Sequence, residues 1–288
     1  MAGLSFVTLV AYDAMYLPEV VASYYDIADE IVLGLDKDRV SWTGRPFQLD
    51  LAPIKAALEA LDHGHKIRWV EEDFRRGAKP LECETDERTR LAALCAPGHW
   101  VVQIDADEIL LNPREFRDWL LLHGRPGINY VATWVMVYKR FESDVLVIDD
   151  NMQVISMATL TRGAYLRGRK STEPERMSPL KLLHFAWGRS DAEVQEKLGN
   201  WGHSQEVDTE AFLKRWRGVS LENHLQQFDL HPLWGPFWPR LRRLPLRPAG
   251  ALEAAALAIP SRRRVPGRLD WKWQQAKGIV GRLLRGRV

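Results

Sequence analysis

Trp100-Val-Val-Gln-Ile-Asp105-Ala-Asp107-Glu108 is an apolar run that ends in three carboxylates within four residues. Such a run predicts a buried strand, and ligands of open α/β sheets bind at the carboxyl ends of the strands. The carboxylates repel one another unless a cation neutralises them. Because oxygen ligands favour Mg²⁺ or Mn²⁺, the stretch predicts a metal site that meets phosphate. A solvated turn whose Asp residues cap the next helix is the plainer alternative.

The segments before and after this stretch alternate between strand and helix patterns. Strands are predicted over 4–11, 29–35, 66–70 and 100–104, and helical spacing follows them over 17–24, 50–61, 86–95 and 112–123. This alternation indicates an α/β fold with a mostly parallel sheet flanked by helices.

The second half has a different pattern. Short β-rich runs cover 129–138, 144–148, 152–161 and 180–186. Two helices then begin, one at Ser190 with a capping box to Glu193 and one at Thr209. We predict a main domain over 1–230, with halves 1–125 and 126–230. A Pro-, Arg- and Trp-rich extension, 231–288, carries no readable fold.

The composition of 46% hydrophobic and 27% charged residues is that of a folded globular protein. The chain lacks a run of ~18 apolar residues that would predict a membrane span. Its N-terminus has no basic residue before the apolar run, which argues against a signal peptide. The two cysteines lack metal-site spacing, so a reduced cytoplasmic protein is expected.

The net charge of +2 hides an asymmetry. Residues 240–288 hold thirteen Lys and Arg against two acids, or +11, which leaves −9 for residues 1–239. Arginine with tryptophan suits an anionic membrane surface, and we expect peripheral association at the inner face. Nucleic acid is the less favoured partner, and a basic extension that only aids solubility is the plainest alternative.

The first 125 residues resemble the family-2-type glycosyltransferases of GT-A fold. The resemblance runs through Val7-Thr-Leu-Val-Ala-Tyr12-Asp13, Leu17-Pro18-Glu19 and Asp26-Ile-Ala-Asp-Glu30-Ile-Val. It implies that Tyr12 and Asp13 lie in a loop that contacts the nucleotide, and that Asp36 holds the base or ribose. It also implies that Arg90 lies near the phosphates. The turn after Asp36 departs from the family pattern.

The family's metal-binding triplet matches Asp105-Ala106-Asp107. The resemblance implies that Asp107 binds the ion directly, while Asp105 contacts ribose or metal-bound water. His184 matches the late histidine that completes the metal site in many GT-A enzymes; a core histidine bonded to backbone is the alternative.

Other polar residues of the second half are weaker candidates. Lys197 and His203 are candidates for phosphate or acceptor contacts, or belong to a solvated helix face. Glu173 and Glu175 lie in a polar loop and are candidates for the base that activates an acceptor hydroxyl, although such residues are usually just solvated.

The sequence therefore predicts a glycosyltransferase that uses Mn²⁺ or Mg²⁺ and a nucleoside-diphosphate sugar, most simply a UDP-sugar. The acceptor would be a saccharide or a lipid-linked molecule in cell-surface glycan synthesis. Two alternatives stay open: a nucleotidyltransferase or phosphohydrolase with the same acidic site, and a non-enzymatic adaptor that binds polyanions.

Overall fold

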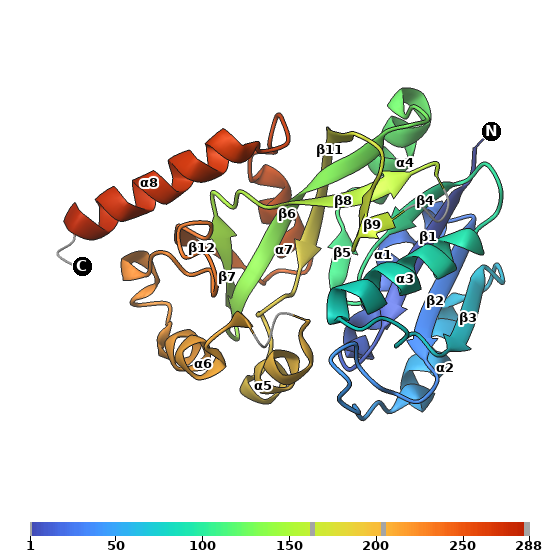
Figure 1. The fold of residues 1–288 in the computed structure, drawn as a ribbon, viewed down its shortest axis with the longest axis horizontal. Helices are drawn as coiled ribbons and strands as arrows, with labels where there is room; N and C mark the ends of the chain where they lie inside the picture. The colour runs from blue at the N-terminus through green and yellow to red at the C-terminus, as the bar shows by residue number, and fades with distance from the viewer. Residues whose placement is uncertain (1, 162–164, 203–205, 285–288) are drawn as a thin grey trace.

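The computed structural model describes residues 2–161, 165–202 and 206–284. The fold is α/β, with a curled, mixed central sheet flanked by helices (Figure 1). The strands along its main path follow the order β12-β7-β6-β8-β4-β1-β2-β3, and β11 joins β6 to β5.

The strands of the sheet have the following bounds: β1 Leu4–Val10, β2 Glu30–Asp36, β3 Ile67–Glu72, β4 Trp100–Gln103, β5 Glu108–Leu110, β6 Asn129–Arg140, β7 Asp144–Asp149, β8 Val154–Thr159, β11 Glu175–His184 and β12 Arg240–Pro245. A separate pair consists of β9 Tyr165–Arg167 and β10 Lys170–Ser171. The α-helices are α1 Leu17–Tyr24, α2 Leu51–Leu61, α3 Pro80–Ala93, α4 Pro113–His123, α5 Asp191–Asn200, α6 Thr209–Gly218, α7 Ala251–Ala258 and α8 Arg268–Leu284.

The first half has the expected parallel strands, since β4, β1, β2 and β3 all pair in parallel. Alternate residues of β1 point to opposite faces. Phe6 packs in the cluster that contains α1, α2 and α4 residues, whereas Val7 packs with Leu91 of α3. Helices therefore cover both faces of this half (Figure 1).

The sheet as a whole is mixed, so the expectation of a mostly parallel sheet is wrong. Strands β7, β8 and β12 run antiparallel to their neighbours. The short link between β6 and β7, residues 141–143, suits antiparallel strands, whereas parallel strands need long crossovers. β12 reaches β7 from much further along the chain, so its direction is set by pairing at the sheet edge.

The last segment of the chain joins the body. β12 pairs with β7 along its length, and Leu241 and Leu244 are buried. α8 lies at one end of the molecule (Figure 1), and the Trp271 ring packs at a tilt against Phe237, with centroids 4.1 Å apart. In the described ranges, no helix combines the length and apolar character needed to cross a membrane.

Candidate functional site

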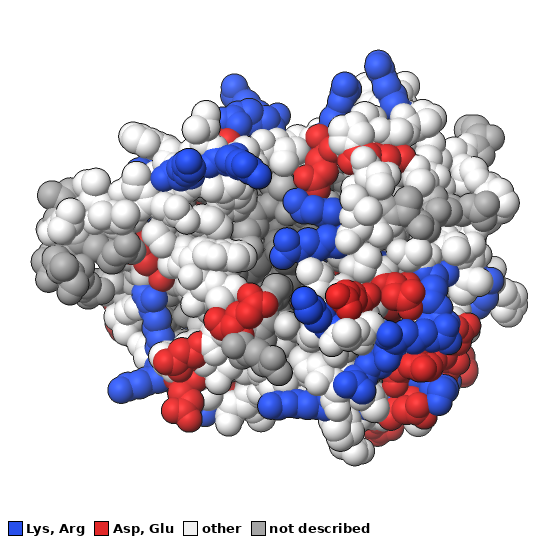
Figure 2. All heavy atoms as spheres, viewed as in Figure 1, with Lys and Arg blue, Asp and Glu red and all other residues white. Residues whose placement is uncertain are grey.

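The carboxyl ends of β1, β2 and β4 open into one cavity of about 610 Å³, which we call the main cavity. Figure 2 shows a hollow near the middle of one face, with Lys and Arg side chains beside it. Residues from both halves of the chain line the main cavity. Seven of the residues expected from the sequence are among them: Tyr12, Asp13, Asp36, Asp105, Asp107, His184 and Lys197.

Asp107 lies at the centre of the charged network in this cavity, and only 2% of it is exposed. Its Oδ2 atom lies 3.0 Å from Lys197 Nζ and 3.3 Å from His184 Nε2. It also accepts a hydrogen bond from Arg189. Burial alone would raise the pKa of Asp107, but Lys197, His184 and Arg189 hold that pKa well below its usual range. The carboxylate is therefore ionised and faces three nitrogen donors.

Asp105 belongs to a second cluster of charges. It pairs with Arg88 at 2.8 Å and with Arg169 at 2.5 Å. Burial would raise its pKa, but Arg169 and Arg88 lower it instead. The backbone N–H of Asp105 donates to Glu108, which is fully buried and also bound by Arg169 at 2.6 Å. Glu108 thus fixes the turn that carries both aspartates.

Strand register brings His184 to this turn. β11 pairs antiparallel with β5, and His184 lies opposite Glu108. The backbone N–H of Phe185 donates to the carbonyl of Asp107 at 2.9 Å. The His184 ring stacks on Trp134, with ring centroids 4.5 Å apart. Its Nδ1 atom is buried without a hydrogen-bond partner among the described residues.

Three arginines at the site were not anticipated from the sequence: Arg88, Arg169 and Arg189. Arg88 lies two residues before the expected Arg90 and contacts Asp105. Arg189 immediately precedes the N-cap of α5, and its Nη2 atom also lies 3.0 Å from Asp13. Neither spacing nor periodicity in the sequence distinguishes these arginines from solvated ones. Their positions depend on contacts between segments that are distant in the sequence.

Arg90, Glu173 and Glu175 do not line the main cavity. Arg90 pairs with Glu72, and its Nη1 atom donates to the carbonyl of Asp73 at 2.9 Å. The other two carboxylates accept hydrogen bonds from hydroxyls of β8 and its following turn: Glu173 from Thr159 and Thr161, and Glu175 from Ser156. His203 lies outside the described residues.

Asp36 and Glu87 mark a third region of the cavity. Both carboxylate oxygens of Asp36 accept backbone N–H groups, at 3.0 Å from Asp38 and Val40 and at 3.2 Å from Phe74, so Asp36 organises the loop after β2. Glu87 of α3 accepts from the Trp42 indole at 2.7 Å. Burial raises the pKa of Glu87 to about 8.

The donor set of the main cavity meets the needs of Mn²⁺ or Mg²⁺ in part. Within the described ranges, no group of three or more His, Cys, Asp and Glu side chains forms a metal cage. Asp107 and His184 nevertheless converge, and an octahedral ion can take its remaining ligands from water and substrate phosphates. These two residues fit an ion held jointly by protein and substrate. Asp105 fits less well because arginines occupy both of its oxygens.

Comparisons with known proteins give little further information. No family model matches the chain, and no curated protein matches it. Among matching solved structures is the crystal structure of 4-diphosphocytidyl-2C-methyl-D-erythritol synthase. It has a TM-score of 0.33 and 12% sequence identity, over 76% of this chain and 87% of that one. At this TM-score the alignment carries no argument about activity.

Proposed function

We propose that the protein is a GT-A-type glycosyltransferase that takes a sugar from a nucleoside-diphosphate donor, most simply a UDP-sugar, and transfers it to a saccharide or lipid-linked acceptor. One observation carries the proposal: Asp107 and His184 converge beside Arg189 and Lys197 at the carboxyl ends of the central strands. Two metal ligands next to two fixed cations suit a diphosphate.

The diphosphate end of the donor would lie against this group. Asp107 and His184 would hold Mn²⁺ or Mg²⁺, which when bound offsets charge on the leaving diphosphate. Arg189 and Lys197 donate to Asp107 in the free protein. Lys197 lines the main cavity and has further N–H donors for phosphate oxygens, whereas Arg189 does not line it and acts through Asp107. Because these cations are buried and already positioned, they stabilise developing negative charge without reorganising.

The nucleoside end would occupy the part of the main cavity that Trp42 and Glu87 line together. Trp42, Phe47 and Phe74 offer apolar surface to a base, and all three line the main cavity. Below its pKa of about 8, Glu87 is mostly protonated. Its hydroxyl can then donate to a base acceptor. Glu173 and Glu175 lie outside the cavity lining, so we assign no step to them.

The first test is ligand binding followed by product analysis. UDP with Mn²⁺ should raise the melting temperature of the full chain, since a ligand at ~100 times its Kd adds ~2.7 kcal/mol of stability. With a sugar donor, release of nucleoside diphosphate supports a glycosyltransferase. Release of pyrophosphate from a nucleoside triphosphate would instead identify the nucleotidyltransferase. No response to any nucleotide would contradict both.

The second test is Asp107→Asn, which keeps the side-chain shape and removes the charge. We expect transfer to fall by ~10²–10³ and Mn²⁺ binding in the presence of UDP to weaken. The variant leaves Lys197 without its counter-charge and Arg189 with Asp13 alone, and breaking a buried pair costs ~3–5 kcal/mol. Unfolding should therefore be followed in parallel, with the exposed Arg114→Ala as the control. Activity within a few-fold of the parent protein would remove Asp107 from the mechanism.

A further inference from the structure

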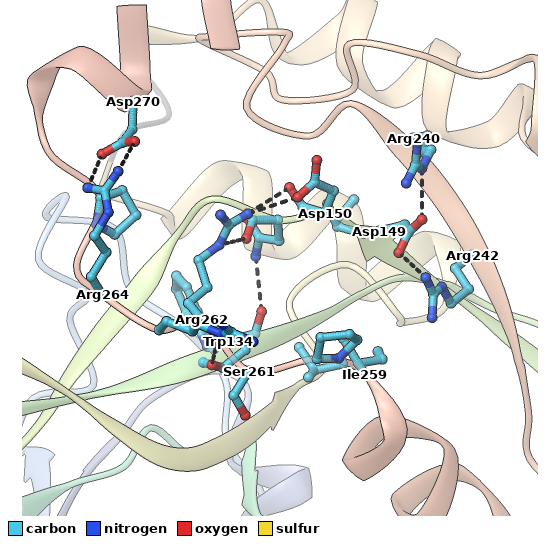
Figure 3. Close-up of a pocket in the computed structure, with 17 residues that line it drawn as sticks. Trp134, Asp149, Asp150, Arg240, Arg242, Ile259, Ser261, Arg262, Arg264 and Asp270 are labelled. Atoms are coloured by element: carbon cyan, nitrogen blue, oxygen red, sulfur yellow. Dashed lines mark hydrogen bonds and ion pairs between the residues drawn. The ribbon is translucent and has the colours of Figure 1, made fainter. Parts of the chain in front are cut away.

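A second cavity of about 620 Å³, which we call the arginine pocket, lies between β6, β7 and the segment 259–266. Five arginines line it: Arg240, Arg242, Arg262, Arg263 and Arg264. Figure 3 shows four of them, from β12 and from the chain that leads into α8, each turned toward an aspartate of the pocket. Nothing in the proposed transfer reaction uses this pocket.

The arginine pocket and the main cavity lie on either side of β6. Successive side chains of a strand point to opposite faces. Thr133 and Val135 line the arginine pocket, whereas Met136 lines the main cavity, and Trp134 contributes to both. The two cavities share no charged residue. A ligand in one can therefore be separated by mutation from a ligand in the other.

The segment 259–266 is held firmly against the body. Lys181 donates to the carbonyls of Leu257 and Ile259 at its start. The backbone N–H of Arg262 donates to Thr133 at 3.1 Å, and its guanidinium donates to the carbonyl of Asn151 at 2.9 Å. The arginines of the pocket are thus presented on a fixed backbone rather than on a loose tail.

The charges of the pocket are only partly balanced. Asp149 pairs with Arg240 and Arg242, each at 2.7 Å, and Asp270 pairs with Arg264 at 2.6 Å. Arg263 has no ion pair among the described residues. Five arginines against three aspartates, the third being Asp150, leave a formal charge of +2. Because each guanidinium carries five N–H donors, Arg240 and Arg242 retain donors beyond those that bind Asp149.

We infer that the arginine pocket binds a phosphate monoester. Its surplus of +2 matches the ≈ −1.5 to −2 charge of such a group at neutral pH. Arginine forks fit phosphate oxygens with paired hydrogen bonds. The volume exceeds that of the phosphate alone, so it accommodates the group that carries the phosphate. The monoester can come from a soluble molecule or from a lipid headgroup presented beside α8.

The test uses the full chain and two probes with the same chemistry. Glycerol 3-phosphate is titrated calorimetrically, and vesicles of phosphatidylcholine with or without phosphatidic acid are tested by co-sedimentation. We expect Arg263→Ala to weaken binding about tenfold, because a charge-assisted hydrogen bond is lost. Within the described part of the chain, Arg263 has no ion-pair partner that its loss would strand, so the fold should be unaffected. Arg114→Ala, on an exposed face of α4, and Lys197→Ala, in the main cavity, should leave binding unchanged.

The two probes distinguish the sources. Binding of glycerol 3-phosphate that Arg263→Ala weakens supports a site open to soluble monoesters. Binding only to vesicles with phosphatidic acid, with the same loss in Arg263→Ala, supports a headgroup site. Binding to neither probe, or equal loss in Arg263→Ala and in Arg114→Ala, overturns the inference. UDP binding in the main cavity is measured on the same variants, so this failure is distinguishable from failure of the proposed transfer.

Discussion

At the scale of single residues, His184 shows how the pairing of strands that are distant in the sequence places a side chain. Its Nε2 atom approaches Asp107 because β11 pairs with β5 in a fixed register, and Trp134 stacks on the ring and fixes its orientation. A histidine inside an apolar run also has an ordinary place in a core. Loss of a metal ligand lowers metal affinity, whereas loss of a core histidine lowers stability.

We expect His184→Ala to weaken Mn²⁺ binding in the presence of UDP by about tenfold or more, since an ion held by two protein ligands loses one of them. UDP binding without metal should change little. Calorimetric titration of Mn²⁺ into the folded variant measures the effect. A purely structural histidine would show the reverse pattern, namely a lower melting temperature and an unchanged Kd for Mn²⁺.

The raised pKa of Glu87 makes the free energy of unfolding depend on pH. Its pKa is about 8 in the folded protein, mainly because burial disfavours the carboxylate, and near 4.5 when unfolded. Between these values the folded state binds more protons than the unfolded state, so this contribution to stability is full below about pH 4.5 and is lost as pH rises through about 8.

Glu87→Gln mimics the protonated side chain and can still accept from Trp42. We expect the stability difference between Glu87→Gln and the parent protein to grow in favour of the variant from pH 5.5 to pH 8. Urea unfolding midpoints at several pH values measure it. A difference that stays constant with pH would show that Glu87 does not titrate in this way.

The sequence predicts the aspartates of the site better than it predicts the arginines. Asp105 and Asp107 follow an apolar strand, and a strand end is visible in the sequence. Arg169 sits in a short turn between β9 and β10, and its contact with Glu108 spans 61 residues. Such a contact has no local pattern, because it depends on the return of the chain after β8.

At the scale of elements, β12 shows a strand that its composition conceals. Its sequence, Arg-Leu-Arg-Arg-Leu-Pro, suggests a basic tail. The strand forms because β7 presents Asp144 and Asp149 to those arginines, with Leu241 and Leu244 packed beneath. The longer strands and helices of the first half were predictable because the residues of each element show its periodicity without reference to a partner. β5 and β9 were not, since each has only three residues, and β12 was not, since its composition is basic and its pairing with β7 defines it.

A chain that ends at Leu230 should therefore be unstable, although the sequence pattern places a domain boundary there. It would lose the burial of Trp238, Leu241 and Leu244. At ~1.5–3 kcal/mol each, this loss is comparable with a total stability of ~5–15 kcal/mol. Circular dichroism and sedimentation should show an unfolded or aggregated product. A chain that ends at Pro266 keeps β12 and α7 and is the control; equal stability of the two would contradict this account.

At the scale of the whole molecule, α8 gives the protein a distinct apolar side. One face of the helix docks on the body, where Gln274 donates to the Pro236 carbonyl at 2.9 Å. The opposite face exposes Leu269, Trp273 and Val280. Basic residues flank this face, among them Arg268, Lys272 and Lys277. An apolar face edged with positive charge is typical of helices that lie in a membrane interface.

We predict that the full chain binds vesicles containing phosphatidylglycerol, and that Trp273→Ser with Val280→Ser weakens this binding by about tenfold or more. The reason is that each large apolar side chain contributes ~1.5–3 kcal/mol when buried. Flotation assays measure the loss. Leu122→Ser is the matched control, because Leu122 is 77% exposed on α4. Equal binding by the double variant and the control would exclude α8 as the contact.

The place of β12 at the edge of the sheet also affects folding during synthesis. During synthesis β7 leaves the ribosome first, and its partner follows after about 90 further residues (149 to 240). At ~5–20 residues per second, the β7 edge stays unpaired for roughly 5–20 s. An open, apolar strand edge is a template for pairing with other chains. Slow translation of 150–240 should therefore lower the yield of soluble protein, and a chaperone that covers strand edges should restore it.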